Sequence, residues 1–297
     1  MPAPTPFASS PAAPVALGIM LRDDTVDLAN PGAYQLAVLL AGGRCCLAVL
    51  EVARQKIVAL EDLALASPAA LPTLAAGHEL LSCQGWSRVR VAVGGGAFTL
   101  LPAPLFRPGD EDGYLRLHHE LAPTERAVAY ALPPASPAHE LVSIFAADAA
   151  LLDWLRATHG PEARLVHHTS SLLAGLLYQQ GPTAPARCSN SCRAGAELTL
   201  LVLGGQLEFC NVFTVSTPED IAYYTILTMQ ELGLSPDQDA VTVWGELTSD
   251  SATYSLLSTY VRHLRFGNRP FGLHYSYRLN ELAENQYFGL FSLAFCG

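Results

Sequence analysis

Two segments of the chain, Tyr34–Leu50 and Ala196–Val212, share one pattern and align without a gap at a spacing of 162 residues. In each segment an apolar run is followed by a Gly-Gly pair and a second apolar run. The positions that coincide are Leu36 with Leu198, Leu39 with Leu201, Gly42 with Gly204, and Gly43 with Gly205. Two glycines between apolar runs are typical of a tight β-hairpin turn, which requires positive φ angles. The sequence therefore predicts one β-unit used twice.

Each predicted hairpin is followed by a third short strand, a helix-like segment and a buried strand, at 89–93 in the first copy and 241–244 in the second. A duplicated β-β-β-α-β unit resembles the layout of the actin, sugar-kinase and Hsp70-type ATPases, in which a nucleotide lies between the halves. We therefore expect an α/β fold with two ribonuclease-H-like domains around a cleft. The Gly42-Gly43 and Gly204-Gly205 turns are expected to face each other across that cleft.

Composition suggests where these domains begin and end. Residues 1–18 are rich in proline and alanine and lack a basic region, so we interpret them as a frayed tail rather than a signal peptide. Residues 181–196 are rich in glycine, proline and serine and read as a linker. The predicted domains are 19–182 and 183–297.

Periodicity and turn residues predict the elements within these domains. The expected strands are 34–41, 45–51, 56–62, 88–93, 139–146, 164–168 and 241–244. The expected helices are 70–82, 109–121, 148–158, 170–179, 217–232 and 249–262.

Charge and hydropathy exclude several functions. The net charge is −10, and Lys56 is the only lysine, so no lysine lies in a P-loop motif. An acidic chain also lacks the clustered bases of a duplex-binding surface, so no nucleic-acid partner is expected. Half of the residues are hydrophobic, but no apolar run is long enough to span a bilayer, so no membrane insertion is expected. The predicted location is the cytoplasm.

The residues that would hold a nucleotide are incomplete. Actin-type ATPases end the first strand of each half with an aspartate that positions hydrated Mg²⁺. Here the corresponding residues are Leu40 or Ala41 in one half and Val202 or Leu203 in the other. The candidate cleft residues are Gly42, Gly43, Gly204, Gly205, Gly245 and Glu246, with Glu246 as a possible ribose contact. The glycine run at 94–96 is interpreted as a flexible turn, since no helix opens behind it.

Metal and catalytic motifs are also weak. Cys188 and Cys192 form a C-x3-C pair with no second pair of ligands, and the pairs His118-His119 and His167-His168 each offer at most one ligand to a given ion. No G-x-S-x-G nucleophile motif is present. We therefore predict no catalytic residue, no metal and no cofactor.

Two resemblances to known families follow from longer motifs. The stretch LVSIFAADAALLDWLRATHGPEARLVHHTSSLLAGLL resembles the middle of the pilus-assembly adaptor PilM and related secretion-system proteins. Four further motifs resemble the bacterial domain of unknown function 3822. They are FTLLPAPLF, YLRLHHEL, FTVSTPEDIAYYTILTMQELGL and the C-terminal HLRFGNRPFGLHYSYRLNELAENQYFGLFSLAFC. Both resemblances imply an actin-like fold, and the second implies no established activity.

The predicted function is a non-catalytic adaptor or scaffold with a degenerate actin-like fold that binds an unidentified protein partner. The alternative is a nucleotide-binding ATPase with a non-standard phosphate site. Aromatic residues crowd the last 32 positions, where they either close the core of the second domain or form the partner's interface. Tyr275 and Tyr277 are expected on one face of a strand. The oligomeric state is left open.

Overall fold

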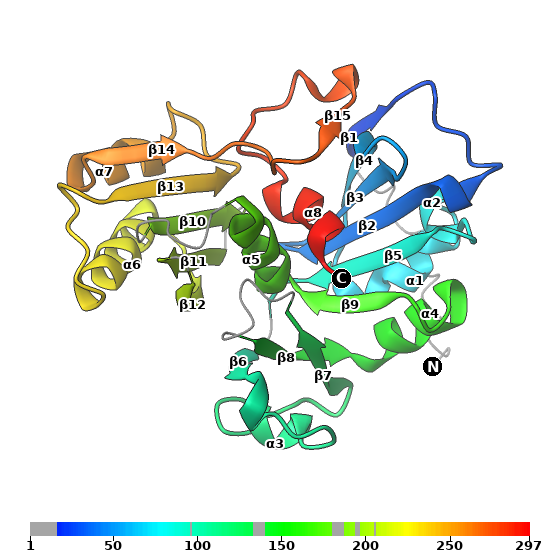
Figure 1. Ribbon diagram of the computed structural model, residues 1–297, viewed down its shortest axis with the longest axis horizontal. Coiled ribbons are helices and arrows are strands. Elements are labelled where there is room, and N and C mark those ends of the chain that lie inside the picture. Colours follow the sequence, from blue (N-terminus) through cyan, green and yellow to red (C-terminus); the bar gives the residue numbers. More distant parts are fainter. Residues whose placement is uncertain (1–16, 96, 133–139, 180–186, 194–196, 205) are drawn as a thin grey trace, which may run out of the picture.

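The computed structural model describes residues 17–95, 97–132, 140–179, 187–193, 197–204 and 206–297. Two β-sheets stand side by side, and the helices α5 (His168–Gln179) and α8 (Phe288–Ser292) lie between them (Figure 1). This is the duplicated α/β architecture that the sequence predicts.

The first sheet contains the first copy of the unit. Its strand order is β1-β4-β3-β2-β5-β9, with β2, β5 and β9 parallel and β1, β4, β3 and β2 successively antiparallel. The strands are β1 (Leu17–Arg22), β2 (Tyr34–Ala41), β3 (Arg44–Glu51), β4 (Lys56–Ala64), β5 (Arg88–Val93) and β9 (Arg164–His167). Gly42 and Gly43 have φ angles of 58° and 71°, so the predicted tight turn between β2 and β3 is confirmed.

The second sheet repeats the same connectivity in the order β12-β11-β10-β13-β14. Its strands are β10 (Arg187–Arg193), β11 (Glu197–Leu203), β12 (Leu207–Thr214), β13 (Ala240–Gly245) and β14 (His263–Phe266). Strand β2 in the first sheet and strand β10 in the second occupy equivalent places. In each sheet the antiparallel strands lie on one side of this strand and two parallel strands lie on the other.

This connectivity corrects the alignment of the two copies. The segment predicted as a linker contains β10, the first strand of the second unit, so the β2–β3 hairpin corresponds to β10–β11 and not to β11–β12. The sequence pattern missed β10 because its residues, RCSNSCR, are mostly polar. The strand is held by backbone pairing with neighbours on both sides rather than by an apolar run.

The corrected alignment also moves the second glycine turn. Gly204 lies between β11 and β12, at the opposite end of its sheet from the β10–β11 connection that matches Gly42-Gly43. The expectation that the two glycine turns face each other is therefore wrong. Gly205 itself lies outside the described residues.

An insertion between β5 and β9 builds a third, smaller sheet. Strands β6 (Phe98–Pro102), β8 (Leu141–Asp148) and β7 (Glu125–Ala131) pair in that order, and α3 (Glu111–Leu115) packs on them. Asp148 then caps α4 (Ala149–His159), because its carboxylate accepts hydrogen bonds from the first amides of the helix. The helix predicted at 70–82 is broken into α1 (Leu71–Ala75) and α2 (Glu79–Ser82).

The outer layer of the second sheet consists of α6 (Pro218–Glu231) and α7 (Ala252–Tyr260) (Figure 1). Thr217 and Asp220 form a capping box at the start of α6. The buried side of α6 includes Ile221, Thr225 and Met229, which face the core of this half.

The C-terminal segment packs on the first sheet. Strand β15 (His274–Tyr275) pairs with β4 next to β1, and Ser276 donates a 2.8 Å hydrogen bond to Asp23, which also accepts one from Lys56. The tail therefore does not simply close the second domain. The strand ends at Tyr275, and Tyr277 begins a 3-10 turn with 59% of its surface exposed. The expectation that these two tyrosines share one strand face is wrong.

Contact between α5 and α8 depends on a glycine. A Cβ atom at Gly175 would overlap Ser292 and Phe288 of α8. We expect Gly175→Ala to lower the free energy of unfolding by about 1–3 kcal/mol, as overpacking does. Helix propensity alone predicts the opposite, a rise of about 1 kcal/mol in the free energy of unfolding. Urea unfolding of Gly113→Ala in α3, where a Cβ meets open space, is the matched control. A stabilised Gly175→Ala variant would contradict this packing.

Candidate functional site

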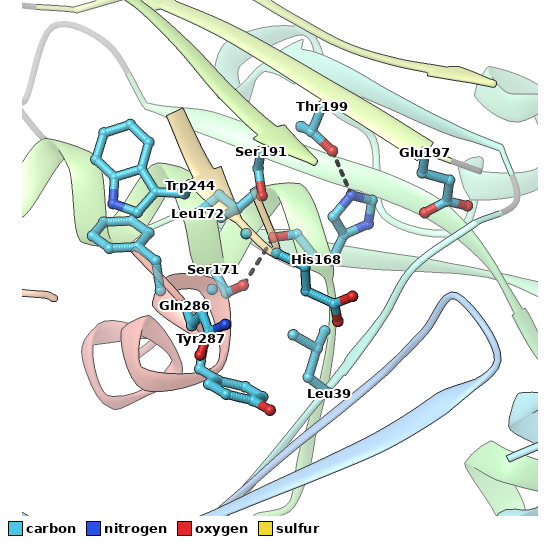
Figure 2. A pocket seen from close by; sticks show the side chains of 14 residues that line it. Leu39, His168, Ser171, Leu172, Ser191, Glu197, Thr199, Trp244, Gln286 and Tyr287 are labelled. Atoms are coloured by element: carbon cyan, nitrogen blue, oxygen red, sulfur yellow. Dashed lines mark hydrogen bonds between the residues drawn. The ribbon is translucent and has the colours of Figure 1, made fainter. Parts of the chain in front are cut away.

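A cleft lies between the sheets at the carboxyl ends of their parallel strands. It is formed by β2, α5, β10, β11, the end of β13 and the segment before α8 (Figure 2). The lining residues are Leu39, His168, Ser171, Leu172, Ser191, Glu197, Thr199, Trp244, Gly245, Glu246, Gln286, Tyr287, Phe288 and Gly289. Its open volume is about 50 Å³, whereas ligand pockets commonly measure roughly 300–1,000 Å³.

The start of α5 joins the two halves. The His168 ring points towards β11, where its Nε2 lies 2.9 Å from Thr199 Oγ1 (Figure 2). The neighbouring His167 ring lies 4.5 Å from the His168 ring, is stacked on Phe98 and is hydrogen-bonded to Thr169. Burial lowers the pKa of His167 to about 4, because a charged imidazole is poorly solvated there. One ring nitrogen of each histidine is therefore already bonded to a threonine.

The second half contributes the end of β13. Gly245 has a φ of 104°, which a residue with a side chain rarely adopts, and it lines the cleft together with Glu246 as the sequence suggests. Trp244 lies against Gly267, where any Cβ would overlap the indole ring, and its Nε1 donates to the Asn268 carbonyl.

Residues 285–289, which we call the strap, cross this cleft from one half to the other. The Asn285 side chain donates 3.0 Å hydrogen bonds to the carbonyls of Gly245 and Leu247, and its own carbonyl accepts one from Gly245 N. Phe288 packs on Trp244 with ring centroids 5.0 Å apart. The strap therefore forms hydrogen bonds with the backbone groups at the end of β13 and just after it.

The other end of the strap is fixed to the first sheet. Tyr287 donates a 2.8 Å hydrogen bond to Asp62 on β4, and it adopts a left-handed backbone conformation with φ 57°. Asp62 is 1% exposed and also accepts a 2.7 Å hydrogen bond from Arg44 Nε. Burial and the nearby Asp62 carboxylate raise the pKa of Tyr287, which keeps its hydroxyl protonated as a donor.

Sequence reasoning missed this network, although a signal for it exists. Glu61 and Asp62 are adjacent acids in a strand that is otherwise almost entirely apolar, and buried carboxylates require partners. Adjacent residues of a strand point to opposite faces. Glu61 accordingly pairs with Arg22 and His78, while Asp62 pairs with Arg44 and Tyr287.

The other predicted site residues are spread out. Gly42 and Gly43 form their hairpin turn outside the cleft lining, and Gly204 belongs to the turn at the far end of β11. Only Gly245 and Glu246 of the six candidates line the cleft in the part of the chain that the structure describes.

The residues expected to stand in place of the second phosphate-binding aspartate also differ from the prediction. Val202 and Leu203 end β11, whereas the strand that matches β2 is β10. Near its end β10 places Ser191 in the cleft. Neither strand carries an acidic residue, since β2 reads YQLAVLLA and β10 reads RCSNSCR. Two acids, Glu197 and Glu246, line the cleft from other positions.

The residues that the structure describes contain no group of three or more His, Cys, Asp or Glu side chains that could hold a metal ion. None of their helices is both long and apolar enough to cross a bilayer. Lys56 forms a 2.9 Å ion pair with buried Asp23 on the first sheet and does not line the cleft.

The model of the DUF3822 family, described as a protein of unknown function, matches residues 23–264. The chain belongs to this family. A crystal structure from Bacteroides thetaiotaomicron, described as having an actin-like ATPase fold and unknown function, is similar with a TM-score of 0.69 and 18% identity over 82% of this chain and 94% of that one.

A second similar structure is the PilM-PilN type IV pilus biogenesis complex. It matches with a TM-score of 0.56 and 16% identity, covering 90% of this chain and 98% of that one. No curated protein matches the chain significantly. The family and the actin-like fold expected from the sequence are confirmed.

Proposed function

We propose that this member of the DUF3822 family is a non-catalytic adaptor that uses an actin-like fold to bind a protein partner. The observation that carries the proposal is the strap across the cleft. Its hydrogen bonds and aromatic packing use the same end of β13 that a nucleotide between the two halves would contact.

The charges of the cleft support the same proposal. Triphosphate and Mg²⁺ require carboxylates to hold the ion and cations or amides to hold the phosphates. The central strands of both halves lack acids, and the lining residues include no lysine or arginine. The lining side chains therefore supply two carboxylates but no lysine or arginine to hold phosphates.

The likeness to the PilM-PilN complex adds to the proposal that the partner is a protein. In that complex a chain of similar fold is assembled with another protein. We propose by analogy that the present chain also acts by binding rather than by turnover.

A second candidate function is nucleotide binding with a non-standard phosphate site. It is favoured by Glu197 and Glu246, which place two carboxylates in the cleft where a hydrated Mg²⁺ would find oxygen ligands. The two proposals differ in whether Mg-ATP stabilises the folded chain.

We expect millimolar Mg-ATP to leave the melting temperature unchanged within error. A ligand at 100 times its dissociation constant stabilises by about 2.7 kcal/mol, which for a chain of this size is a shift of several degrees, at roughly 2–4 °C per kcal/mol. Differential scanning fluorimetry with Mg-ATP and with Mg²⁺ alone measures this. An Mg-dependent rise that Glu246→Ala abolishes would establish the nucleotide-binding alternative instead.

A further inference from the structure

The negative charge of the chain is concentrated in its second half. Residues 194–261 contain no lysine, arginine or histidine but nine acids: Glu197, Glu208, Glu219, Asp220, Glu231, Asp237, Asp239, Glu246 and Asp250. The whole chain has 27 acids and 17 bases, so the remaining residues hold 18 acids against the same 17 bases. Nine of the ten net negative charges therefore belong to this one segment, which includes both α6 and α7.

An apolar groove of about 320 Å³ lies between α6 and α7. These helices cover the side of the second sheet that faces away from α5 (Figure 1). The groove is lined by Glu219, Ala222, Tyr223, Ile226, Leu227, Gln230, Leu256 and Tyr260. Two tyrosine side chains of the groove are largely exposed to solvent, Tyr223 at 61% and Tyr260 at 56%.

The groove residues of α6 follow a stripe that differs from its fully buried stripe, although Ile226 also packs against the core of this half. Glu219, Tyr223, Ile226, Leu227 and Gln230 follow one stripe of the helix at intervals of three and four residues. The core-facing stripe is a different set, including Ile221, Thr225 and Met229. A second apolar stripe with exposed tyrosines has the composition of a binding surface, because tyrosine buries a large area at low entropic cost.

We propose that the α6–α7 groove binds an amphipathic helix of a partner protein that carries basic residues beside its apolar face. The inference rests on the adaptor function proposed above and names the chemistry of the partner. The apolar groove accepts leucine-type anchors spaced one helical turn apart. Glu219 lines the groove, and Asp220 and Glu231 also lie on α6, so these acids attract the flanking lysines or arginines. No base within the 194–261 segment opposes them.

The same charges argue against two other occupants. An anionic lipid surface is repelled by a segment that has nine acids and no base. A second copy of this chain would bring two such acidic faces together, which like-charge repulsion disfavours.

The test is a selection from a displayed library of 18-residue helices with leucines fixed along one face and Lys, Arg, Glu, Asp, Ser or Gln randomised elsewhere. The full chain serves as bait, and fluorescence anisotropy measures the affinity of the enriched peptides. The variants are Tyr223→Glu and Tyr260→Glu in the groove. Tyr277→Glu is the matched control, since this tyrosine is 59% exposed on the C-terminal segment.

We expect the enriched helices to be rich in lysine and arginine. Each groove variant should weaken their binding at least tenfold, whereas Tyr277→Glu should change it less than twofold. Affinity should fall as salt is raised from 50 to 500 mM, since screening shortens the range of the charges. Enrichment of neutral or acidic helices, no enrichment, or binding that survives both groove variants would overturn the inference.

Two measurements separate failure of this inference from failure of the adaptor function. If Mg-ATP leaves the melting temperature unchanged but the groove variants still bind every selected helix, the groove inference alone is wrong. If Mg-ATP stabilises the chain, the proposed adaptor function is wrong, whether or not the selected helical peptides bind. A dimer in sedimentation that Tyr223→Glu dissociates would assign the groove to self-association and overturn the proposed partner.

Discussion

Replacing Asp62 with alanine is expected to lower the free energy of unfolding by about 3 kcal/mol and to release the strap. Removing one partner of a buried charge pair typically costs about 3–5 kcal/mol. The lower end applies because the Arg44 side chain is 31% exposed and regains water once its partner is removed. The Tyr287 hydroxyl also loses its acceptor.

Urea unfolding measures the loss of stability, and hydrogen exchange measures the strap. In Asp62→Ala the amides of residues 285–292 should exchange faster than in the wild type, while those of α6 should be unchanged. Asp153→Ala is the matched control, because its ion pair with Arg126 is solvent-exposed on both sides and such pairs contribute up to about 1 kcal/mol. Equal losses in the two variants would mean that Asp62 does not fix the strap.

A second large effect is expected at Glu61, and it depends on pH. Burial by itself would raise the pKa of this carboxyl, but hydrogen bonds from His78 and Arg22 outweigh it and hold the pKa below its ordinary value of 4.5. A depressed folded-state pKa means that the pairing stabilises the fold above the unfolded-state pKa. That stabilisation is lost as pH falls through the lower folded-state pKa.

We therefore expect Glu61→Gln to be about 3–5 kcal/mol less stable than the wild type at pH 7. The difference should shrink progressively below pH 4.5, because the carboxyl of the unfolded wild type takes up a proton there, and the folded wild type follows only at its lower pKa. Denaturant unfolding at pH 7, 5, 4 and 3 measures it. Glu79→Gln removes the exposed partner of Arg22 and should cost up to about 1 kcal/mol. A difference between wild type and Glu61→Gln that grows on acidification would contradict the assigned ion pairs.

Several elements were predictable because local chemistry specifies them. Strands β2 to β5 are apolar runs bounded by turn residues, and the positive φ angles of Gly42 and Gly43 require residues without a side chain. The capping box of α6 is set by four consecutive residues. Duplication and the actin-like fold could be inferred from these elements because their order along the chain is itself informative.

Strand β10 and the strap were decided by the tertiary structure. The residues of β10 are polar, and they form a strand because β11 and β13 offer hydrogen bonds on both sides. The alignment based on glycine pairs therefore matched the wrong hairpins by one strand. Local propensity carries no information about a pairing such as that of Cys188 with Val241, which lie 53 residues apart in the sequence.

The cleft likewise combines features that the sequence predicts with contacts that only the tertiary structure shows. The sequence by itself determined that β2 lacks acidic residues, and it singled out Gly245 and Glu246. Only the tertiary structure brought Tyr287 to Asp62 and Asn285 to Gly245, across separations of 225 and 40 residues. Such contacts join segments that are far apart in the sequence, so only the complete fold shows them. A buried carboxylate in the sequence predicts that a partner exists, but the fold selects which residue it is.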